Sequence, residues 1–482
     1  MLPKEYFEDP LTRGVAYGAY QHVKQNRFTL LKLPVGYGKT IISMHVARAI
    51  AQQHDNHLQL MVIAPKAKRL DKSFEEAIQS VEEYYHVKLS IVPINGQETG
   101  TFAGLNTMKR LKPEMWQEFV DRLCQHPTLM ILDETHMQMR NPTGQANKTF
   151  VSLFKQIDRA KSTLHILGLT ATPFDTSILD TVGYLVLNGD YSSRTAFYRQ
   201  EIVGYQTAFA RGLNQRDVDN MIVDRSYRIH KEMFTNLQRV LKRINRIIYA
   251  PDVPVTFHIP KNEFKIVPVS LSQQGAAMIG RIEMFERQRA YDSNGAKMTD
   301  YTRAITTDAN VLNKVVELVK NPKHNQPLIF YRADLTLDAL RQRFDAEGIK
   351  HFEINGHNQD YFDDNDEKSP VFVQYLSGAA AFESKSSNLS IYLELPASDI
   401  NFQQSLGRNA RRGQQMDVIT NYIIEPLQGT DKIRYFNKTY NRVVNKTHWN
   451  TLFGSTFTSK WGAFGENQIR GAVKSTEPTT IK

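Results

Sequence analysis

Residues 33–40 read Leu33-Pro34-Val35-Gly36-Tyr37-Gly38-Lys39-Thr40, between an apolar run at 28–33 and a helical pattern at 40–52. The two glycines let the backbone curl so that its N–H groups face a polyphosphate, and a helix N-terminus adds partial positive charge. Lys39 would reach the β- and γ-phosphates, and the Thr40 hydroxyl would hold a magnesium ion. A bare Gly-x-Gly-Lys-Thr also occurs in chance loops, but the strand before it and the helix after it favour a phosphate loop.

A second polar segment ends an apolar strand, in the sequence Met130-Ile131-Leu132-Asp133-Glu134-Thr135-His136. Open α/β sheets bind ligands at the carboxyl ends of their strands, where these two carboxylates would lie. Asp133 would bind magnesium, directly or through water, and Glu134 would orient and deprotonate an attacking water. His136 would hydrogen-bond toward a second domain and report the state of a γ-phosphate. Alone, the segment indicates a solvated acidic turn; its pairing with the phosphate loop favours catalysis.

The pattern of apolar residues divides the chain into four parts. Short apolar runs alternate with helical patterns over residues 1–190, which predicts an α/β domain with a doubly wound parallel sheet. Residues 191–310 are polar, aromatic and mostly helical in pattern, and we expect a helical insertion or linker there. Alternation resumes over residues 311–430, which predicts a second α/β domain. Residues 431–482 form a basic, aromatic tail.

Two basic segments each allow two interpretations. A helical pattern at 234–248 carries four cations, which form either a solvated face on a packed helix or a surface that follows phosphates. Aromatic residues four apart in the tail favour a helix packed on the second domain over an arm that stacks on nucleic-acid bases. The four cations are Arg239, Lys242, Arg243 and Arg246, and the spaced aromatic residues are Trp449, Phe453, Phe457 and Trp461.

Two further segments carry polar groups suited to a phosphate site. One ends another strand in Leu169-Thr170-Ala171-Thr172-Pro173. The other reads Gln404-Ser405-Leu406-Gly407-Arg408-Asn409-Ala410-Arg411-Arg412-Gly413-Gln414 and lies in the second domain. Arg408 and Arg411 are three residues apart, so on a helix they share a face and can reach a γ-phosphate as arginine fingers. The alternative is a merely basic helix.

In this order, the four segments resemble the motifs of superfamily-two helicases and translocases, over roughly residues 10–420. Within that superfamily the chain is most similar to the Swi/Snf-type DNA-dependent ATPases. Residues 137–143, Met-Gln-Met-Arg-Asn-Pro-Thr, resemble the continuation of their acidic box, and residues 407–414 resemble their final motif. The strand pattern at 264–271 is similar to the start of their second lobe. Ala171 departs from the type, which usually has glycine there.

The resemblance implies two RecA-like domains in tandem that use ATP and Mg²⁺. It implies catalytic roles for Lys39, Glu134, Arg408 and Arg411, magnesium binding by Thr40 and Asp133, and coupling by His136, Thr170, Thr172 and Gly378. It implies nucleotide binding by Gly36, Tyr37, Gly38, Lys39, Thr40 and Gln404, with Arg13 and Gln21 as candidates for reading adenine. Pro65 and Lys66 would contact the phosphates of a nucleic-acid strand.

The activity that this resemblance implies is a nucleic-acid-dependent ATPase that translocates on duplex or branched DNA. Phosphate contacts do not read sequence, so we expect little base specificity and strong salt dependence. A strand-separating DNA or RNA helicase is one alternative, and an ATP-gated nucleic-acid clamp is an alternative of another class. A clamp needs no water activation, so Glu134 and Arg411 favour a motor. The compact chain suits a phage or mobile-element protein of replication or repair.

Composition sets wider limits on the class of protein. The 482 residues include 60 Lys and Arg against 50 Asp and Glu, a net charge of +10 that favours a polyanionic partner. The single cysteine, Cys124, excludes a disulfide framework and a cysteine-rich zinc module within the chain. No run approaches the ~18 apolar residues of a membrane span, and the N-terminus has no apolar signal segment. We therefore expect a monomeric protein of the cytoplasm, which is the host cytoplasm for a phage protein.

Overall fold

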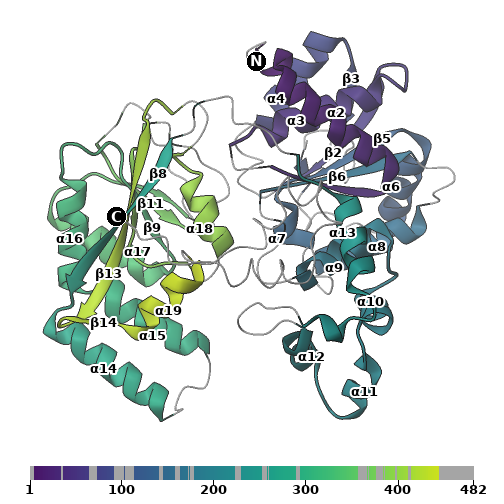
Figure 1. Cartoon of the computed structure of the whole chain (residues 1–482). Coiled ribbons are helices and arrows are strands. Elements are labelled where there is room, and N and C mark those ends of the chain that lie inside the picture. Colours follow the sequence, from purple (N-terminus) through teal and green to yellow (C-terminus); the bar gives the residue numbers. More distant parts are fainter. Residues whose placement is uncertain are drawn as a thin grey trace. The chain divides into compact units, whose positions relative to one another are not determined.

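The computed structural model separates the chain into two compact units, which divide between Pro254 and Val255 (Figure 1). It describes residues 5–33, 36–64, 73–91, 102–103, 113–139, 145–157, 163–171, 173, 178–222, 230–251, 258, 260–288, 294–355, 366, 368–375, 384, 386–396, 399–410 and 414–443. No helix in this part of the chain is long and apolar enough to cross a membrane.

The first unit is built on a seven-stranded sheet in which every neighbouring pair is parallel. The strand order is β3-β2-β5-β6-β1-β7, and β4 also pairs with β2. The strands are β1 (Phe28–Lys32), β2 (His57–Ile63), β3 (Lys88–Ile91), β4 (Phe102–Ala103), β5 (Thr128–Leu132), β6 (Leu164–Thr170) and β7 (Ile248–Tyr249). The helices between them include α2 (Pro10–Gln25), α3 (Lys39–Ala51), α4 (Ser73–Tyr85), α6 (Pro113–Gln125), α7 (Thr135–Met139) and α8 (Gln145–Gln156).

Burial explains why these runs form central strands. All five residues of β5, Thr-Leu-Met-Ile-Leu, are buried, as expected for a strand covered on both faces. In parallel register, Leu132 of β5 lies opposite Gly168 of β6, and Thr170 of β6 lies opposite Lys32 of β1. The carboxyl ends of β5, β6 and β1 therefore share one edge of the sheet, and the loops that follow them carry the candidate site.

Short helices follow β6 and end in a basic helix, α13 (Leu237–Ile247). The carboxylate of Glu201 is fully buried and accepts hydrogen bonds from Arg239 (2.7 Å), Arg243 (3.2 Å) and the Tyr191 hydroxyl (2.8 Å). A buried charge of this kind is tolerated because it is paired and hydrogen-bonded. Arg239 and Arg243 thus attach α13 to the rest of the unit, in agreement with the interpretation of this segment as a packed helix. The other helices here are η2 (Ile178–Thr181), α9 (Val182–Asn188), α10 (Arg194–Glu201), α11 (Tyr205–Ala210), α12 (Gln215–Ile222) and η3 (Lys231–Met233).

The second unit has its own seven-stranded sheet, parallel except for one short antiparallel pair. The order is β10-β11-β9-β12-β13-β14, and β8 pairs with β13. The strands are β8 (Lys261–Ser270), β9 (Leu328–Tyr331), β10 (Phe352–Ile354), β11 (Val371–Gln374), β12 (Leu389–Tyr392), β13 (Val418–Gln428) and β14 (Asp431–Lys432). The helices are α14 (Gln273–Arg287), α15 (Asn294–Thr306), α16 (Ala309–Val319), α17 (Asp334–Ala346), α18 (Asp399–Leu406) and α19 (Arg434–Val443).

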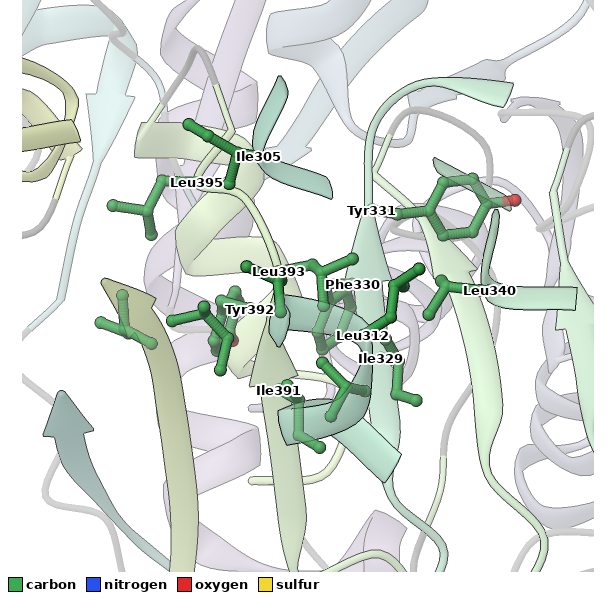
Figure 2. Packing of buried hydrophobic residues seen from close by; sticks show 14 of the residues in the cluster. Ile305, Leu312, Ile329, Phe330, Tyr331, Leu340, Ile391, Tyr392, Leu393 and Leu395 are labelled. Carbon is green, nitrogen blue, oxygen red and sulfur yellow. The ribbon is translucent and has the colours of Figure 1, made fainter. Parts of the chain in front are cut away.

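The core of the second unit lies around its two central strands. Ile329 and Phe330 of β9 and Ile391 of β12 pack with Leu312 of α16 and Leu340 of α17 (Figure 2). None of the five is more than slightly exposed to solvent. The chain therefore forms two tandem RecA-like α/β units, each with its own hydrophobic core, which confirms the predicted fold class.

The compact units divide the stretch 191–310, which was expected to be a separate insertion. Its helices up to α13 belong to the first unit, whereas β8, α14 and α15 belong to the second. The strand predicted at 264–271 is β8, which runs beside β13 over ten residue pairs, from Lys261 to Ser270.

After the short strand β14, the tail continues as the helix α19, which packs on the second unit. Phe436 and Tyr440 of α19 are buried, and the Tyr435 ring stacks on Tyr301 of α15 with centroids 4.4 Å apart. This part of the tail therefore contributes to the core of the unit. Residues 444–482, with the four spaced aromatic residues, lie outside the described residues.

Candidate nucleotide-binding site

The phosphate loop joins β1 to α3 at the carboxyl edge of the first sheet. Leu33, directly after β1, donates its backbone N–H to the Thr170 carbonyl at 3.2 Å, so the loop starts in register with the end of β6. Gly36 and Gly38 have φ values of 80° and 81°, in the left-handed region that favours glycine. A Cβ at Gly38 would meet no atom within 4 Å, so backbone conformation, not crowding, requires glycine there.

Lys39 is the first residue of α3, and its side chain turns back over the loop. Its ammonium donates to the Leu33 carbonyl at 3.3 Å, which holds Nζ above the curled backbone. Thr40 follows in the first turn, where the helix dipole favours an anion. Lys39 and Thr40 therefore both lie at the N-terminus of α3, directly after the loop.

The acidic turn follows β5, with Asp133 almost buried at 5% exposure. Its backbone N–H donates to the Ile63 carbonyl of β2 at 2.8 Å, which fixes the start of the turn. Glu134 has a φ of 46°, a strained conformation for a residue other than glycine. Such strain persists only where the surroundings enforce it, and it concentrates at functional sites.

Thr135 and His136 tie this turn to the end of β6. The Thr135 hydroxyl donates to the Leu132 carbonyl at 2.6 Å. A Cβ added at Gly168 would lie only 2.7 Å from the oxygen of this hydroxyl, so glycine leaves the space that Thr135 needs. His136 Nδ1 lies 2.9 Å from the Thr170 hydroxyl and 3.4 Å from Glu134 Oε2. His136 therefore lies between Glu134, the candidate base, and Thr170 at the end of β6. The carbonyl of Thr170 also accepts the N–H of Leu33 at the start of the phosphate loop.

In the sheet, one strand, β6, separates β1 with its phosphate loop from β5 with its acidic turn. Neighbouring strands are about 4.8 Å apart, so β1 and β5, separated by β6, are about 10 Å apart. The Thr40 hydroxyl and the Asp133 carboxylate are hard oxygen donors of the kind that Mg²⁺ prefers. The described residues contain no cluster of three or more His, Cys, Asp or Glu that could hold a metal ion. Mg²⁺ is usually bound through one or two protein oxygens and keeps several waters, so one hydroxyl and one carboxylate are chemically suited to it.

The two adenine candidates lie at different ends of α2. This helix connects to β1 through Asn26 and Arg27 alone, so it runs back along the strand. Arg13, near its N-terminus, donates from Nε to the Phe7 carbonyl at 2.8 Å. Gln21 is eight residues further on, about 12 Å along the helix axis.

In the second unit, α18 carries Gln404 and is followed at once by Arg408. Both side chains are buried, Arg408 with 4% exposure. The Arg408 N–H donates to the Ser405 carbonyl, and its carbonyl accepts from the Ser384 N–H, both at 3.1 Å. Five other residues singled out from the sequence lie outside the described residues: Pro65, Lys66, Thr172, Gly378 and Arg411.

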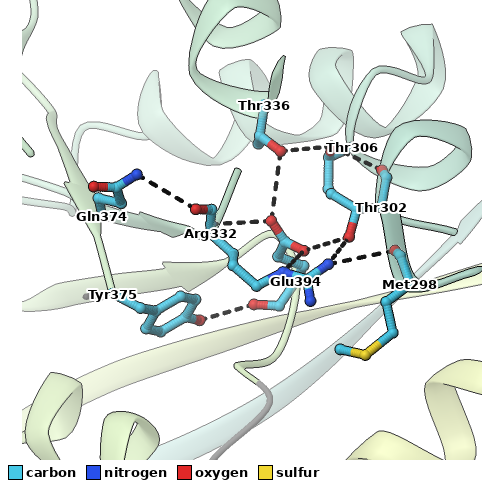
Figure 3. A network of polar contacts seen from close by, with 8 residues as sticks. All are labelled: Met298, Thr302, Thr306, Arg332, Thr336, Gln374, Tyr375 and Glu394. Atoms are coloured by element: carbon cyan, nitrogen blue, oxygen red, sulfur yellow. Dashed lines mark hydrogen bonds and ion pairs between the residues drawn. The ribbon is translucent and has the colours of Figure 1, made fainter. Parts of the chain in front are cut away.

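A polar network at the carboxyl edge of the second sheet was missed by the sequence analysis (Figure 3). Glu394, just after β12, accepts from the backbone N–H of Arg332 at 3.0 Å and from the Thr302 hydroxyl at 2.9 Å. Arg332 Nε lies 3.3 Å from the same carboxylate, and the Tyr375 hydroxyl donates to the Glu394 carbonyl at 2.8 Å. The network fixes the ends of β9, β11 and β12 relative to α15.

The sequence indicates the contacts of Gly168 and of Glu394 with different strength. Gly168 lies inside a mostly apolar strand, which indicates that another group approaches closely, here Thr135. Glu394 carries no comparable signal, because its partners are up to 92 residues away in the chain.

Comparison with known proteins adds one family match. Residues 7–175 match the model of the family described as "Type III restriction enzyme, res subunit". The Sulfolobus solfataricus SWI2/SNF2 ATPase core, solved in complex with dsDNA, is 14% identical, with 96% of each chain covered and a TM-score of 0.36. No curated protein matches the chain. The matched residues contain both the phosphate loop and the acidic turn.

Proposed function

We propose that this protein is a nucleic-acid-dependent ATPase that uses ATP hydrolysis to translocate on DNA, with duplex or branched DNA as its substrate. The observation that carries the proposal is the shared sheet edge of the first unit. There the phosphate loop follows β1, the acidic turn follows β5, and the hydrogen bond between His136 and Thr170 joins that turn to the end of β6.

The residues of this edge have separate roles in hydrolysis. Lys39 and the N–H groups of the loop bind the β- and γ-phosphates of ATP. Thr40 and Asp133 would hold a Mg²⁺ ion, which would supply positive charge to neutralise the phosphates. Glu134 orients a water in line with the γ-phosphorus and accepts its proton as the new P–O bond forms. The bond to the β-phosphate oxygen breaks, and ADP and phosphate leave.

Residues from both units supply the remaining groups of the proposed mechanism. Arg408 and Arg411 act on the γ-phosphate as its charge develops, and Gln404 assists nucleotide binding. His136 and Thr170 relay the state of the nucleotide, together with Thr172 and Gly378. Pro65 and Lys66 contact the phosphates of the DNA backbone. The roles of residues outside the described part of the chain rest on the sequence resemblance alone.

We expect double-stranded DNA to stimulate ATP hydrolysis most. The reason is the similarity of residues 137–143 and 407–414 to the duplex translocases. The measurement is steady-state ATPase at saturating ATP with duplex DNA, single-stranded DNA and RNA of equal length, each at two salt concentrations. Stimulation should fall steeply with salt, because binding through phosphates releases counterions.

Glu134→Gln protein, prepared in parallel, is the control for contaminating ATPases in this assay. Stimulation by single-stranded DNA or RNA with duplex inactive would replace the translocase by a strand-separating helicase. Nucleic-acid binding that depends on ATP but occurs without hydrolysis would favour the clamp.

We expect Arg411→Ala to reduce turnover much more than ATP affinity, and Arg408→Ala to act similarly but less strongly. An arginine on the γ-phosphate acts mainly on charge that develops in the transition state. A hydrogen bond to a charged group contributes about 1.5–3 kcal/mol, which corresponds to about a ten- to hundredfold loss of rate.

Arg408 is buried, so the melting temperature of each variant is measured together with kcat and the Kd for ATP. Collapse of ATP affinity with normal turnover of bound ATP would make these arginines ground-state anchors instead.

A further inference from the structure

The acidic turn of the first unit contains only Asp133 and Glu134, because β5 ends at Leu132 and α7 begins at Thr135. Glu134 connects the strand to the helix with a φ of 46°, in the left-handed region that favours glycine. A residue with a side chain stays in such a conformation only where its surroundings prevent it from relaxing. The contacts around the turn must therefore hold Glu134 in place.

Thr135 closes this turn from its helical end. Its side chain is fully buried, and its hydroxyl donates to the Leu132 carbonyl at 2.6 Å. A second, longer contact joins the same hydroxyl to the Leu169 carbonyl of β6 at 3.4 Å. The hydroxyl thus ties the first residue of α7 both to the end of its own strand and to the neighbouring strand.

The backbone of β6 explains how Thr135 reaches the neighbouring strand. The Thr170 carbonyl accepts the Leu33 N–H, so it faces β1. Successive carbonyls of a strand point to opposite sides, so the Leu169 carbonyl faces β5. The last register pair of β5 with β6 joins Leu132 to Gly168. Beyond that pair, the Thr135 hydroxyl approaches the Leu169 carbonyl from the side of β5.

Gly168 makes room for this contact. A Cβ at residue 168 would lie 2.7 Å from the Thr135 hydroxyl oxygen, 2.9 Å from Leu30 and 3.1 Å from Phe28. Any larger residue would therefore push Thr135 or the apolar side chains aside. Glycine weakens a strand interior, because it has no side chain to pack. Its presence at this position is explained by the close approach of Thr135.

The turn also determines where the Glu134 carboxylate lies. Its Oε2 is buried at 3.4 Å from His136 Nδ1, and among the described residues this oxygen has no hydrogen-bond partner. Its position therefore depends on the backbone that carries it more than on neighbouring side chains. If the turn relaxed to an ordinary φ at Glu134, the carboxylate would point in another direction.

We propose that Thr135 is a positioning residue for Glu134: its hydroxyl, accommodated by Gly168, holds the turn in the strained conformation that directs the Glu134 carboxylate. This inference rests on the proposed ATPase function, in which Glu134 accepts the proton of the attacking water. Such a step is sensitive to small displacements, and a shift of about 1 Å can cost about a hundredfold in rate. Thr135 touches neither ATP nor Mg²⁺ in this proposal and acts only through Glu134.

The test compares Thr135→Val with a matched control, Thr181→Val. Threonine and valine have the same branched shape, but valine has a methyl group in place of the hydroxyl. Thr181 of the same unit is also buried, and its hydroxyl donates to the Ile178 carbonyl, three residues earlier, at 2.6 Å. The two hydrogen bonds therefore have the same length and the same spacing. The readouts are kcat at saturating ATP and DNA, the Kd for ATP, and the melting temperature.

We expect Thr135→Val to lower kcat about ten- to hundredfold, the scale of a displaced catalytic group. The Kd for ATP should stay close to wild type, because the phosphate loop is unchanged. Both valine variants lose one buried hydrogen bond, so their melting temperatures should fall by similar amounts, but Thr181→Val should keep its kcat. Thr135→Ser retains the hydroxyl and should recover most of the activity.

A double variant tests whether Thr135 acts through Glu134. In Glu134→Gln the proposed base is already absent, so adding Thr135→Val should change the residual rate of single-turnover hydrolysis by less than about twofold. Independent effects of two residues would instead multiply. If the two losses multiply, Thr135 acts on another group and the proposal is overturned.

The proposal is also overturned if Thr135→Val retains kcat within about twofold of an active wild type, or if Thr181→Val loses as much. Should Thr135→Val fail to fold, Thr135→Ala, which removes the hydroxyl without adding a group, is judged by the same criteria. Failure of the proposed function gives a different result, namely wild-type protein without nucleic-acid-stimulated ATPase, or Glu134→Gln with normal turnover.

Discussion

Glu134→Gln is expected to bind ATP with near-normal affinity and to turn it over about 10²–10⁴-fold more slowly, the usual loss when a general base is removed. Glutamine has the shape of glutamate but cannot accept the proton of the attacking water. The loop N–H groups, Lys39 and Asp133 remain, so the ground-state contacts to the nucleotide persist. The variant should accumulate with ATP and nucleic acid bound, which equilibrium binding and single-turnover hydrolysis would both measure.

The structure indicates that Glu134→Gln changes the proton acceptor and leaves the backbone at this position unaltered. Glu134 has a φ of 46°, and glutamine tolerates that conformation no worse than glutamate, so the backbone strain is unchanged. Glu83 is an exposed glutamate on α4 of the same unit, so Glu83→Gln is the matched control. We expect this control variant to behave as wild type. Turnover of Glu134→Gln within threefold of wild type would remove Glu134 from the role of base.

The fold could be predicted from the sequence where the signal is local and repeated. The alternation of apolar runs and helical patterns predicted the central strands β1, β2, β5 and β6. It could not predict β7, because two residues, Ile248 and Tyr249, carry no periodic pattern. These residues join the first sheet by pairing with Leu30 and Leu31 of β1. The two compact units divide at residues 254–255, within the stretch that was expected to be one insertion.

The candidate site shows the same contrast between local and distant interactions. Gly38, Lys39 and Thr40 were predictable because a strand, a turn and a helix follow one another directly. The contact of His136 with Thr170 spans 34 residues, and that of Asn409 with Ser387 spans 22. Such pairs depend on which strands become neighbours, and the sequence does not state that order. The positions of candidate residues were therefore more predictable than the partners that orient them.

Lys39→Ala is expected to reduce ATP hydrolysis by about 10³-fold and to weaken ATP binding as well. The ammonium lies over the loop through its 3.3 Å hydrogen bond to the Leu33 carbonyl, so its charge is already placed when the nucleotide arrives. A preorganised charge of this kind costs no reorganisation during the reaction, and removal of one such donor commonly costs about 10²–10³-fold in rate. Because the same charge also attracts the ground-state phosphates, kcat and ATP affinity should fall together, unlike in Glu134→Gln.

Two companion variants separate charge from geometry. Lys39→Arg retains the positive charge, but its planar guanidinium cannot replace a compact ammonium above a tightly curled backbone, so it should recover binding better than turnover. Lys32→Met is the matched control, because Lys32 ends β1 one residue before the segment and burial lowers its pKa to about 8. This variant loses a cation from the same strand end and should keep most of the activity. Equal losses in Lys32→Met and Lys39→Ala would mean that general positive potential, not the position of one ammonium, binds the phosphates, and the assignment of the loop would fail.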